Sequence, residues 1–161
     1  MKKEFRCCFA GHSDINISTE KEKVKEIAEK LIAQYCVKEF WVGSYGNFDF
    51  CCAKAIMELK EIYPDIKIFV VIPYLTKRIT ESKEEYYKKF DEIITANISL
   101  STPKRLFILK TNEYIVNNSK FMICYVNRSW GGAVQTFEYA KRRKLEIFNI
   151  AECTSRRDEK K

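Results

Sequence analysis

Short apolar runs alternate along this chain with longer stretches in which apolar residues recur at helical spacing. The runs are rich in β-branched and aromatic residues, and they predict strands over residues 4–10, 39–42, 66–72, 120–126 and 146–150. Strands that alternate with helices usually pair in parallel through right-handed crossovers. The pattern therefore predicts an α/β fold, a single domain with a doubly wound, mostly parallel sheet and helices on both faces.

The stretches between these strands predict four helices, over residues 18–36, 47–63, 104–118 and 134–144. Ser18 and Asn47 are the expected N-caps of the first two helices, because their side chains accept hydrogen bonds from free backbone N–H groups. Pro64 should end the second helix and Pro103 should open the third, since proline breaks a helix interior but suits its first turn.

The connection over residues 73–103 is less regular than the rest of the chain. A further helix is expected over residues 82–90, and Ile93-Ile94 predict either a short strand or the start of a loop. Two interpretations of the whole segment stay open. It is either a lid over a binding site or an ordinary long connection.

Glycine is confined to places where a predicted strand gives way to a helix. All five glycines fall at three such junctions: Gly11 after the first strand, Gly43 and Gly46 after the second, and Gly131 and Gly132 after the strand at 120–126. In a parallel sheet these junctions meet at the carboxyl edge, where such folds bind ligands. We therefore expect one shared ligand cleft at this edge.

The Gly131-Gly132 pair is the expected centre of that cleft. Two glycines permit a tight turn and a close backbone approach, and the first N–H groups of the following helix form an anion site. A phosphate, or a nucleotide that carries one, is the expected guest. The alternative is that the pair is only a short turn between a strand and a helix.

Further residues, most of them polar or aromatic, accompany the glycines as candidate binding residues. They are His12, Ser13 and Asp14 at the first junction, Ser44, Tyr45, Asn47 and Asp49 at the second, and Arg128, Ser129, Trp130, Ala133, Gln135, Thr136 and Glu138 at the third. Tyr45 and Trp130 are candidates to stack on a nucleobase, although aromatic residues at such turns also serve packing.

Two acids in this set, Asp49 and Glu138, fall in the opening turns of their helices. An acid in this position often only complements the helix dipole. In a shared cleft the two carboxylates would instead bind ribose hydroxyls or stabilise an oxocarbenium-like centre at a sugar carbon. They are therefore the candidate catalytic residues if the protein is an enzyme.

Several classes of site are disfavoured by what the sequence lacks. No Gly-x-Gly-x-x-Gly follows the first strand and no Gly-x-x-x-x-Gly-Lys-Ser/Thr occurs, which argues against a dinucleotide redox cofactor and a P-loop. The seven cysteines include no Cys-x-x-Cys, and His12 is the single histidine, so zinc-ligand spacing is absent. We expect no cofactor, no metal, and cysteines that pack as small apolar residues in a reducing cytoplasm.

The net charge is +7, and acids and bases are mostly interspersed, as in residues 20–26, while the concentrated positive charge is C-terminal, at residues 141–144, 156–157 and 160–161. This pattern is typical of solvated helix faces, so we do not expect nucleic acid as a partner. No apolar run is long enough for a membrane span, and the start of the chain lacks a signal-peptide core. We expect a cytoplasmic protein in which residues 1–152 form the binding domain and residues 153–161 form a disordered, charged tail.

In combination, the junction motifs resemble the SLOG superfamily. They are Gly-His-Ser-Asp after the first strand, Gly-x-Tyr-Gly-Asn-Phe-Asp after the second, and Ser-Trp-Gly-Gly-Ala-x-x-Thr-x-Glu-Tyr-Ala after the strand at 120–126. The superfamily holds the DprA/Smf proteins and the LOG phosphoribohydrolases, and the chain looks most similar to small bacterial and phage members. Over residues 4–150 the resemblance implies a Rossmann-like fold, a nucleotide or nucleotide-derivative pocket at Gly131-Gly132, and a homodimer or higher homo-oligomer.

LOG enzymes hydrolyse the N-glycosidic bond of a nucleoside monophosphate with a Pro-Gly-Gly-x-Gly-Thr-x-Glu-Glu motif and an arginine on the preceding helix. Here Trp130 replaces the proline, and Val134-Gln135 stand where one glycine is expected, so Thr136 falls one residue late. The arginine position falls at Thr111, beside Asn112, which joins the candidate binding residues. Glu138 matches the first motif glutamate only through this insertion, so the departures favour binding over hydrolysis.

Three functions follow from the sequence, in a definite order. The first is to bind a nucleotide or nucleotide-derived small molecule, as a sensor or a sequestering protein, without turnover. The alternative is a LOG-like phosphoribohydrolase that cleaves the N-glycosidic bond of a nucleoside monophosphate. The third is nucleic-acid binding of the DprA kind.

Overall fold

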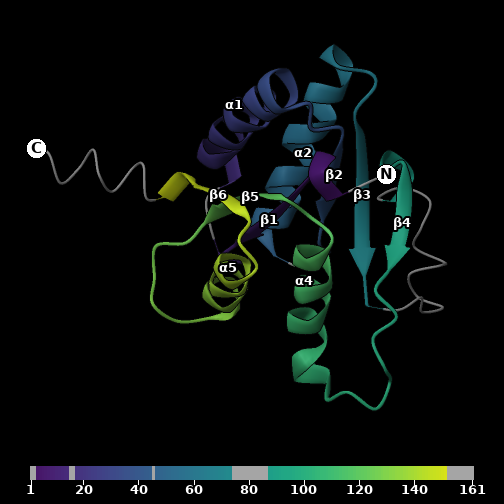
Figure 1. Cartoon of the computed structure of the whole chain (residues 1–161), viewed down its shortest axis with the longest axis vertical. Coiled ribbons are helices and arrows are strands. Elements are labelled where there is room, and N and C mark those ends of the chain that lie inside the picture. Colours follow the sequence, from purple (N-terminus) through teal and green to yellow (C-terminus); the bar gives the residue numbers. More distant parts are fainter. Residues whose placement is uncertain (1–2, 15–16, 45, 74–86, 152–161) are drawn as a thin grey trace, which may run out of the picture.

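Each predicted strand lies in one sheet of the computed structural model, which describes residues 3–14, 17–44, 46–73 and 87–151 (Figure 1). The six strands are β1 (Arg6–Gly11), β2 (Glu39–Val42), β3 (Lys67–Ile72), β4 (Glu92–Thr95), β5 (Phe121–Tyr125) and β6 (Glu146–Asn149). They lie in the order β4-β3-β2-β1-β5-β6, and every neighbouring pair is parallel. The predicted doubly wound α/β fold is confirmed.

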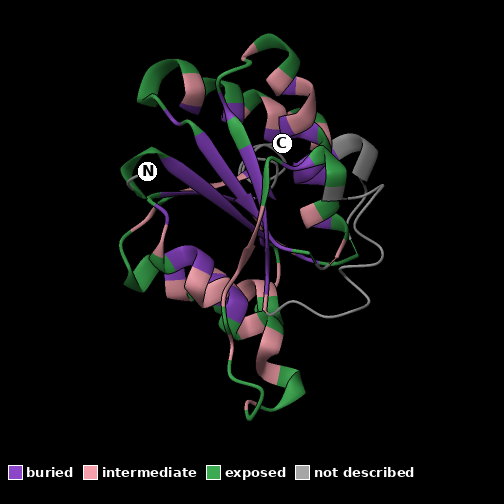
Figure 2. Cartoon of the chain, turned by 90° about the vertical axis from the view of Figure 1, so that its right-hand side faces the viewer, coloured by how far each residue is buried: buried purple, intermediate pink, exposed green. Residues whose placement is uncertain are grey.

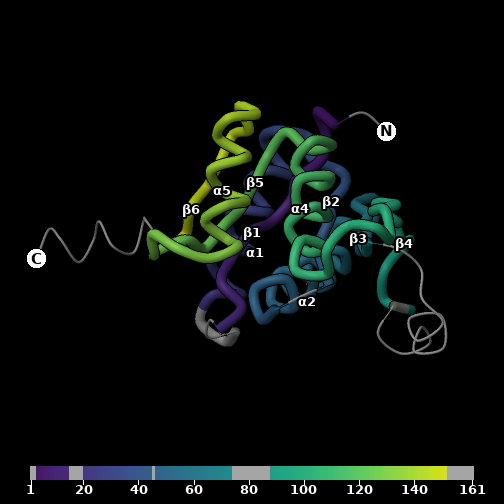
Figure 3. Tube along the Cα trace, turned by 90° about the horizontal axis from the view of Figure 1, so that it is seen from below, coloured from purple at the N-terminus to yellow at the C-terminus, as the bar shows by residue number. Residues whose placement is uncertain are grey.

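In the described part of the chain, four α-helices cover the two faces of this sheet. They are α1 (Ile17–Tyr35), α2 (Asn47–Ile62), α4 (Phe107–Asn117) and α5 (Gly132–Arg142), with short 3-10 turns η1 (Lys3–Phe5), η3 (Tyr87–Lys89) and η4 (Lys104–Leu106). Seen from below in Figure 3, α4 and α5 lie on one side of the row of strands and α2 lies on the other. Helix α1 packs with α2 into the same core.

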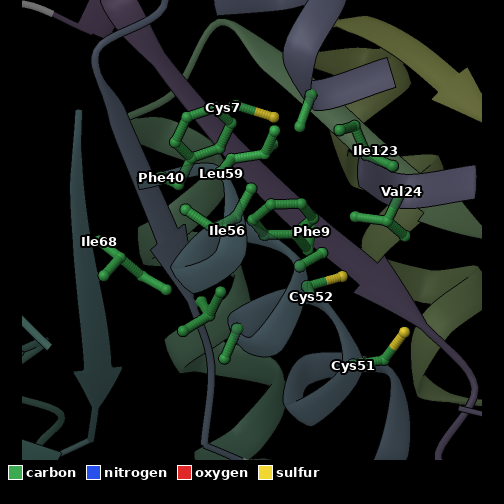
Figure 4. Close-up of a cluster of buried hydrophobic side chains, with 14 of the residues drawn as sticks. Cys7, Phe9, Val24, Phe40, Cys51, Cys52, Ile56, Leu59, Ile68 and Ile123 are labelled. Atoms are coloured by element: carbon green, nitrogen blue, oxygen red, sulfur yellow. The ribbon is translucent and has the colours of Figure 1, made fainter. Parts of the chain in front are cut away.

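The alternating faces of the strands divide the core into two layers. Cys7 and Phe9 of β1 face α1 and α2, whereas Cys8 and Ala10 face α4 and α5. Figure 2 shows the strands buried between these helical layers, and Figure 4 shows the first layer, where Phe9 packs near Cys52 and Ile56. Both faces are apolar because both are covered, as expected for a parallel sheet.

The strand order contains one topological switch point, between β1 and β5. The chain runs outward from β1 through β2 and β3 to β4, and then returns to place β5 on the other side of β1. The loops that leave β1 and β5 therefore diverge to opposite faces of the sheet. Folds of this class bind ligands in the crevice that opens between two such loops.

Two of the predicted helix caps are wrong. Helix α1 begins at Ile17, so Ser18 lies inside it, and α2 begins at Asn47 with Gly46 as its N-cap. Gly46 has φ of 93°, a value that suits glycine, so the chain turns there and not at Asn47. The backbone N–H of Asn47 instead donates to the carbonyl oxygen of Ser13 at 3.1 Å, which ties the first two junctions together.

The remaining differences concern the ends of elements. The first predicted strand begins as η1 and becomes β1 at Arg6, and the helix expected from residue 104 begins as η4. Ile93-Ile94 belong to β4, so the strand alternative is confirmed. Of the helix expected over residues 82–90, the described part contains the 3-10 turn η3. The lid interpretation concerns residues 73–103, of which residues 74–86 lie outside the described residues, and the tail at 153–161 also lies outside them.

Candidate functional site

A pocket of about 190 Å³ lies at the switch point, between the loops that follow β1 and β5. Its walls come from β1, both loops, and the starts of α2, α4 and α5. The lining residues are Phe9, Ala10, Gly11, His12, Ser13, Asp49, Ile108, Asn112, Arg128, Trp130, Gly131, Gly132, Ala133 and Thr136. Two of the three glycine-bearing junctions therefore meet in one cavity.

The start of α5 presents backbone donors to this pocket. Its N-cap is Gly131, with φ of 105° and no side-chain cap, and the first helical bond runs from the N–H of Gln135 to the oxygen of Gly131. The earlier N–H groups of the first turn have no acceptor within the helix. A Cβ atom built on Gly131 or Gly132 would meet nothing within 4 Å, so this backbone surface is open to an anion.

Thr136 connects α5 to α4 through a hydrogen bond in the wall of the same pocket. Its buried hydroxyl donates to the carbonyl oxygen of Gly132 at 3.0 Å and accepts a hydrogen bond from Nδ2 of Asn112 at 3.3 Å. The bond fixes the amide of Asn112 across the floor of the cavity. Although Thr136 falls one residue late in the sequence motif, it still lines the pocket.

Arg128 is the single lysine or arginine that lines the pocket among the described residues. Its Nη2 donates to Oδ1 of Asp14 at 2.6 Å, and its guanidinium lies 5.1 Å from the ring centroid of Trp130. The hydrogen bond from Arg128 lowers the pKa of Asp14. This ion pair joins the loop after β1 to the loop after β5.

His12 is buried and also connects the loops that follow β1 and β5. Its Nε2 accepts a hydrogen bond from the backbone N–H of Asn127 at 3.2 Å, and its ring meets Tyr125 edge-on at 6.2 Å. Burial, followed by the charge of Arg128, lowers the pKa of His12 from its ordinary value of 6.5. The imidazole is therefore neutral at pH 7, as an acceptor of an N–H group must be.

Acidification should destabilise the fold through this histidine. The pKa of His12 is lower in the folded state, so the unfolded chain binds the extra proton as pH falls below about 6.5, and the free energy of unfolding falls with it. In His12→Gln the side-chain oxygen can still accept the N–H of Asn127 but has no proton to gain. Urea titrations at about pH 5 and pH 7.5 should therefore show a larger loss of stability in wild type than in His12→Gln. Equal losses would contradict the assignment.

A second, smaller cavity of about 140 Å³ adjoins the first. It is lined by Gly43, Ser44, Asp49, Val71, Pro73, Ile108, Thr111 and Asn112. Asp49, Ile108 and Asn112 line both cavities. The glycine-bearing junction after β2 therefore also contributes to the site, through Asp49. A Cβ atom on Gly43 would lie 2.8 Å from Oδ2 of Asp49, and glycine at 43 thus leaves the space that this carboxylate occupies.

Three predicted site residues support the cavities without lining them, and two others, Gln135 and Ser129, do not line or support them through their side chains. Asp14 pairs with Arg128, Gly46 caps α2 against Ser13, and Asn47 bonds to Ser13 through its backbone. Gln135 opens the hydrogen-bond ladder of α5. Ser129 is an exposed residue of the loop after β5. Tyr45 lies outside the described residues.

Glu138 lies away from both cavities. Its carboxylate is half-exposed on the outer face of α5, and its Oε2 is 3.7 Å from Nζ of Lys141, one turn later in the helix. Asp49 is therefore the one carboxylate that lines the cavities within the described part of the chain. The structure does not bring the two candidate acids together.

The sequence did not point to the apolar part of the site. Phe9, Ala10 and Ile108 line the first cavity, and Val71 and Pro73 line the second. Phe9, Ala10 and Val71 belong to strands whose apolar pattern also predicts an ordinary core. Ile108 gave no separate sequence signal, because its exposure in the first turns of α4 is a finding of the structure.

Other site chemistries find little support among the described residues. Burial raises the pKa of Cys51 to about 11 and that of Cys52 well above its ordinary value, so neither is a thiolate at neutral pH. No group of three histidine, cysteine or acidic side chains in the described ranges is placed to hold a metal ion. Within the same ranges, no helix has the length and apolar character that a bilayer crossing requires.

Comparison with known proteins gives a structural match and no sequence match. No protein-family model matches the chain, and no curated protein matches it. The chain is similar to the X-ray structure of DNA processing protein A (DprA) from Streptococcus pneumoniae, with a TM-score of 0.64 and 14% sequence identity. The match covers 89% of this chain and 49% of that chain, so this chain spans about half the length of that protein. At this identity the likeness shows the fold alone: a Rossmann-like fold of the DprA kind.

Proposed function

We propose that this protein binds a nucleotide or nucleotide-derived small molecule and holds it without turnover, as a sensor or a sequestering protein. The observation that carries the proposal is the cavity at the switch point, where the open start of α5 and the guanidinium of Arg128 flank one space. Backbone N–H groups and an arginine are the groups that proteins use to bind phosphate. Asp49 adds an acceptor for ribose hydroxyls, and Trp130, which is 67% exposed, adds a ring that can stack on a base.

Hydrolysis has weaker support. Glycosidases of the common type need two carboxyl groups on either side of the scissile bond. In the described residues one carboxylate, that of Asp49, lines the cavities, and Glu138 is turned toward solvent. Thr111, where the SLOG resemblance expects an arginine, is buried and donates its hydroxyl to the oxygen of Phe107 at 2.7 Å. A LOG-like phosphoribohydrolase therefore remains the second candidate.

Nucleic-acid binding is the third candidate, and the name of the structural neighbour gives it some support. Against it, one cationic side chain lines the cavity among the described residues, whereas nucleic-acid binding draws on many phosphate contacts. Affinity for single-stranded DNA that is tight and falls steeply with salt would favour this candidate over the first.

Mass spectrometry of small molecules released from the purified, denatured protein tests the proposal most directly. An intact nucleotide or nucleotide derivative is the expected finding. A free base together with a ribose phosphate would instead favour the enzyme. The same preparation, tested by calorimetry with a nucleotide panel, should show binding without release of base over many turnovers.

The start of α5 should control phosphate affinity. A Cβ atom at Gly132 meets nothing within 4 Å, so Gly132→Val should fold, but its methyl groups should fill the space over the helix N–H groups. We expect nucleotide affinity to fall by at least about 1.4 kcal/mol, which is a tenfold effect. Gln135→Val is the matched control, because Gln135 is exposed on the same helix and lines neither cavity. Unchanged calorimetric affinity in folded Gly132→Val would contradict this role.

A further inference from the structure

Asn112 and Thr136 form a hydrogen-bonded pair of side chains at the place where the two cavities adjoin. Asn112 of α4 lines both cavities, and Thr136 of α5 lines the first. The two helices lie side by side on one face of the sheet (Figure 3), and Nδ2 of Asn112 lies 3.3 Å from Oγ1 of Thr136. Thr136 is 2% exposed, so its side of the bond is shielded from water. A ligand that spans the two cavities would pass the amide of Asn112.

The hydroxyl of Thr136 determines which end of the Asn112 amide faces it. A threonine hydroxyl has one proton to donate, and here that proton goes to the carbonyl oxygen of Gly132 at 3.0 Å. The hydroxyl can then only accept from Asn112, so the amide must present its NH2 group to Thr136. Oδ1 is the other end of the same planar amide and faces away from Thr136. Within the described residues, this bond is the one that the Asn112 side chain makes, and Oδ1 is left as an acceptor for a ligand.

The distance of this acceptor from the start of α5 indicates which part of a nucleotide it meets. Bonds of 3.0 Å and 3.3 Å link the carbonyl oxygen of Gly132, through Thr136, to the Asn112 amide. Nδ2 of Asn112 therefore lies within about 6 Å of that oxygen. The free N–H groups of α5, where we propose that a phosphate binds, belong to the same first turn. In a nucleotide the sugar joins the phosphate to the base, so an acceptor this close to the phosphate site meets the sugar hydroxyls before the base.

We propose that Asn112 is a specificity-determining residue whose Oδ1, oriented by Thr136, accepts a hydrogen bond from a ribose hydroxyl. The ligand is then a ribonucleotide, or a derivative of one, that keeps this hydroxyl. The inference rests on the proposed function and narrows its ligand class. A site that is built to accept from a hydroxyl discriminates against an analogue without it, because the acceptor then stays unpaired. Asn112 contacts the ligand, and Thr136 is a positioning residue.

Calorimetry with matched nucleotides tests this selection. The probes are the 5′-monophosphates of adenosine, guanosine, cytidine and uridine, followed by the 2′-deoxy and 3′-deoxy analogues of whichever binds wild type most tightly. We expect wild type to bind at least one deoxy analogue about fivefold or more weakly than its parent, which is the size of one neutral hydrogen bond. Equal affinity for the parent and both analogues would overturn the proposal, while the proposed function would stand because nucleotide binds. If none of the four monophosphates binds, the proposed function fails as well.

Asn112→Leu removes both polar atoms of the amide at similar volume. Affinity for the parent nucleotide should fall about fivefold, while affinity for the disfavoured analogue should stay nearly unchanged, so the preference disappears. Asn117→Leu is the matched control, because Asn117 is an exposed asparagine of the same helix that lines neither cavity, and it should keep the preference. An equal fall in both affinities in Asn112→Leu would overturn the contact with the hydroxyl. A changed preference among the four bases, with the deoxy preference kept, would show instead that Asn112 contacts the base.

Thr136→Val and Thr136→Ser separate the hydroxyl of Thr136 from its packing. Valine keeps the shape but leaves Nδ2 of Asn112 without this acceptor, so the amide loses its fixed orientation and the preference for the parent nucleotide should fall. Serine keeps the hydroxyl and should keep the preference. A purely structural role would lower the affinities for parent and analogue together and leave their ratio unchanged. An unchanged ratio in Thr136→Val, or a ratio that serine does not preserve, would overturn the positioning role of Thr136.

Discussion

Replacing Glu39 with alanine is expected to lower the free energy of unfolding by about 3–5 kcal/mol, the usual cost of breaking a buried ion pair from one side. Glu39 opens β2, and its Oε1 accepts from Nε of Arg6 at 3.0 Å and from Nε1 of Trp41 at 3.3 Å. The Arg6 and Glu39 side chains are 8% and 7% exposed. In Glu39→Ala the guanidinium would stay buried without its counter-charge, although it keeps its contact with the Trp41 ring at 4.0 Å.

Urea unfolding followed by tryptophan fluorescence gives the measurement. The informative control is the double variant Arg6→Met, Glu39→Leu, which removes both charges and fills the space with apolar groups. Because the pair must be desolvated to fold, the double variant should recover most of the stability that Glu39→Ala loses. A loss below about 1 kcal/mol in Glu39→Ala would mean that solvent reaches the guanidinium and screens it as at a surface pair.

This ion pair also marks a limit of sequence reasoning. The sequence Lys38-Glu39 looks like an ordinary charged start to a strand. What buries Glu39 is the parallel register that sets it beside Arg6, together with the carbonyl of Asn118, which accepts from the same guanidinium. Register between strands 33 residues apart depends on the whole sheet, and no local pattern reports it.

The part of the site that a single strand-to-helix junction forms was predictable from the sequence. Gly131 and Gly132 follow an apolar strand directly, and a parallel sheet brings such junctions to one edge. The second cavity was not predictable, because its wall needs Ile108 of α4 to lie over the face of β3 that carries Val71. That placement depends on the length of the connection before α4, whose sequence is irregular. The N-cap of α2 was missed by one residue because Asn47 has a good capping side chain while Gly46 has the positive φ.

The position of Glu138 could have been deduced from helix geometry. Thr136 is buried toward α4, where it bonds to Asn112. A residue two positions later is turned by roughly 200° around the helix axis, so it must face the opposite way. The one-residue insertion at Val134-Gln135 lies inside α5, which begins at Gly132, and Glu138 faces solvent. The resemblance identified the right segment, and the helical period separates its threonine from its glutamate.

Because Asp49 lines the cavities and Glu138 faces solvent, we expect substitutions at these two positions to have different effects. Asp49→Asn should weaken nucleotide affinity by about 1.5–3 kcal/mol, because the charged acceptor for ribose hydroxyls is replaced by a neutral amide. Glu138→Gln is the matched control: the same loss of one charge, on a side chain that is half-exposed and paired with Lys141. It should leave affinity within about 0.5 kcal/mol of wild type, as surface substitutions usually do.

The same two variants distinguish a binder from an enzyme. If Asp49 faces a developing positive charge at the anomeric carbon, its loss should slow base release by several kcal/mol of barrier while binding largely remains. If it only accepts hydrogen bonds from the sugar, affinity falls and wild type releases no base. We expect the second result, since one carboxylate lines the cavities within the described residues and a glycosidase of the common type needs two. Calorimetry and a base-release assay on the same proteins decide it. Multiple turnovers in wild type that vanish in Asp49→Asn, with affinity retained, would establish the hydrolase instead.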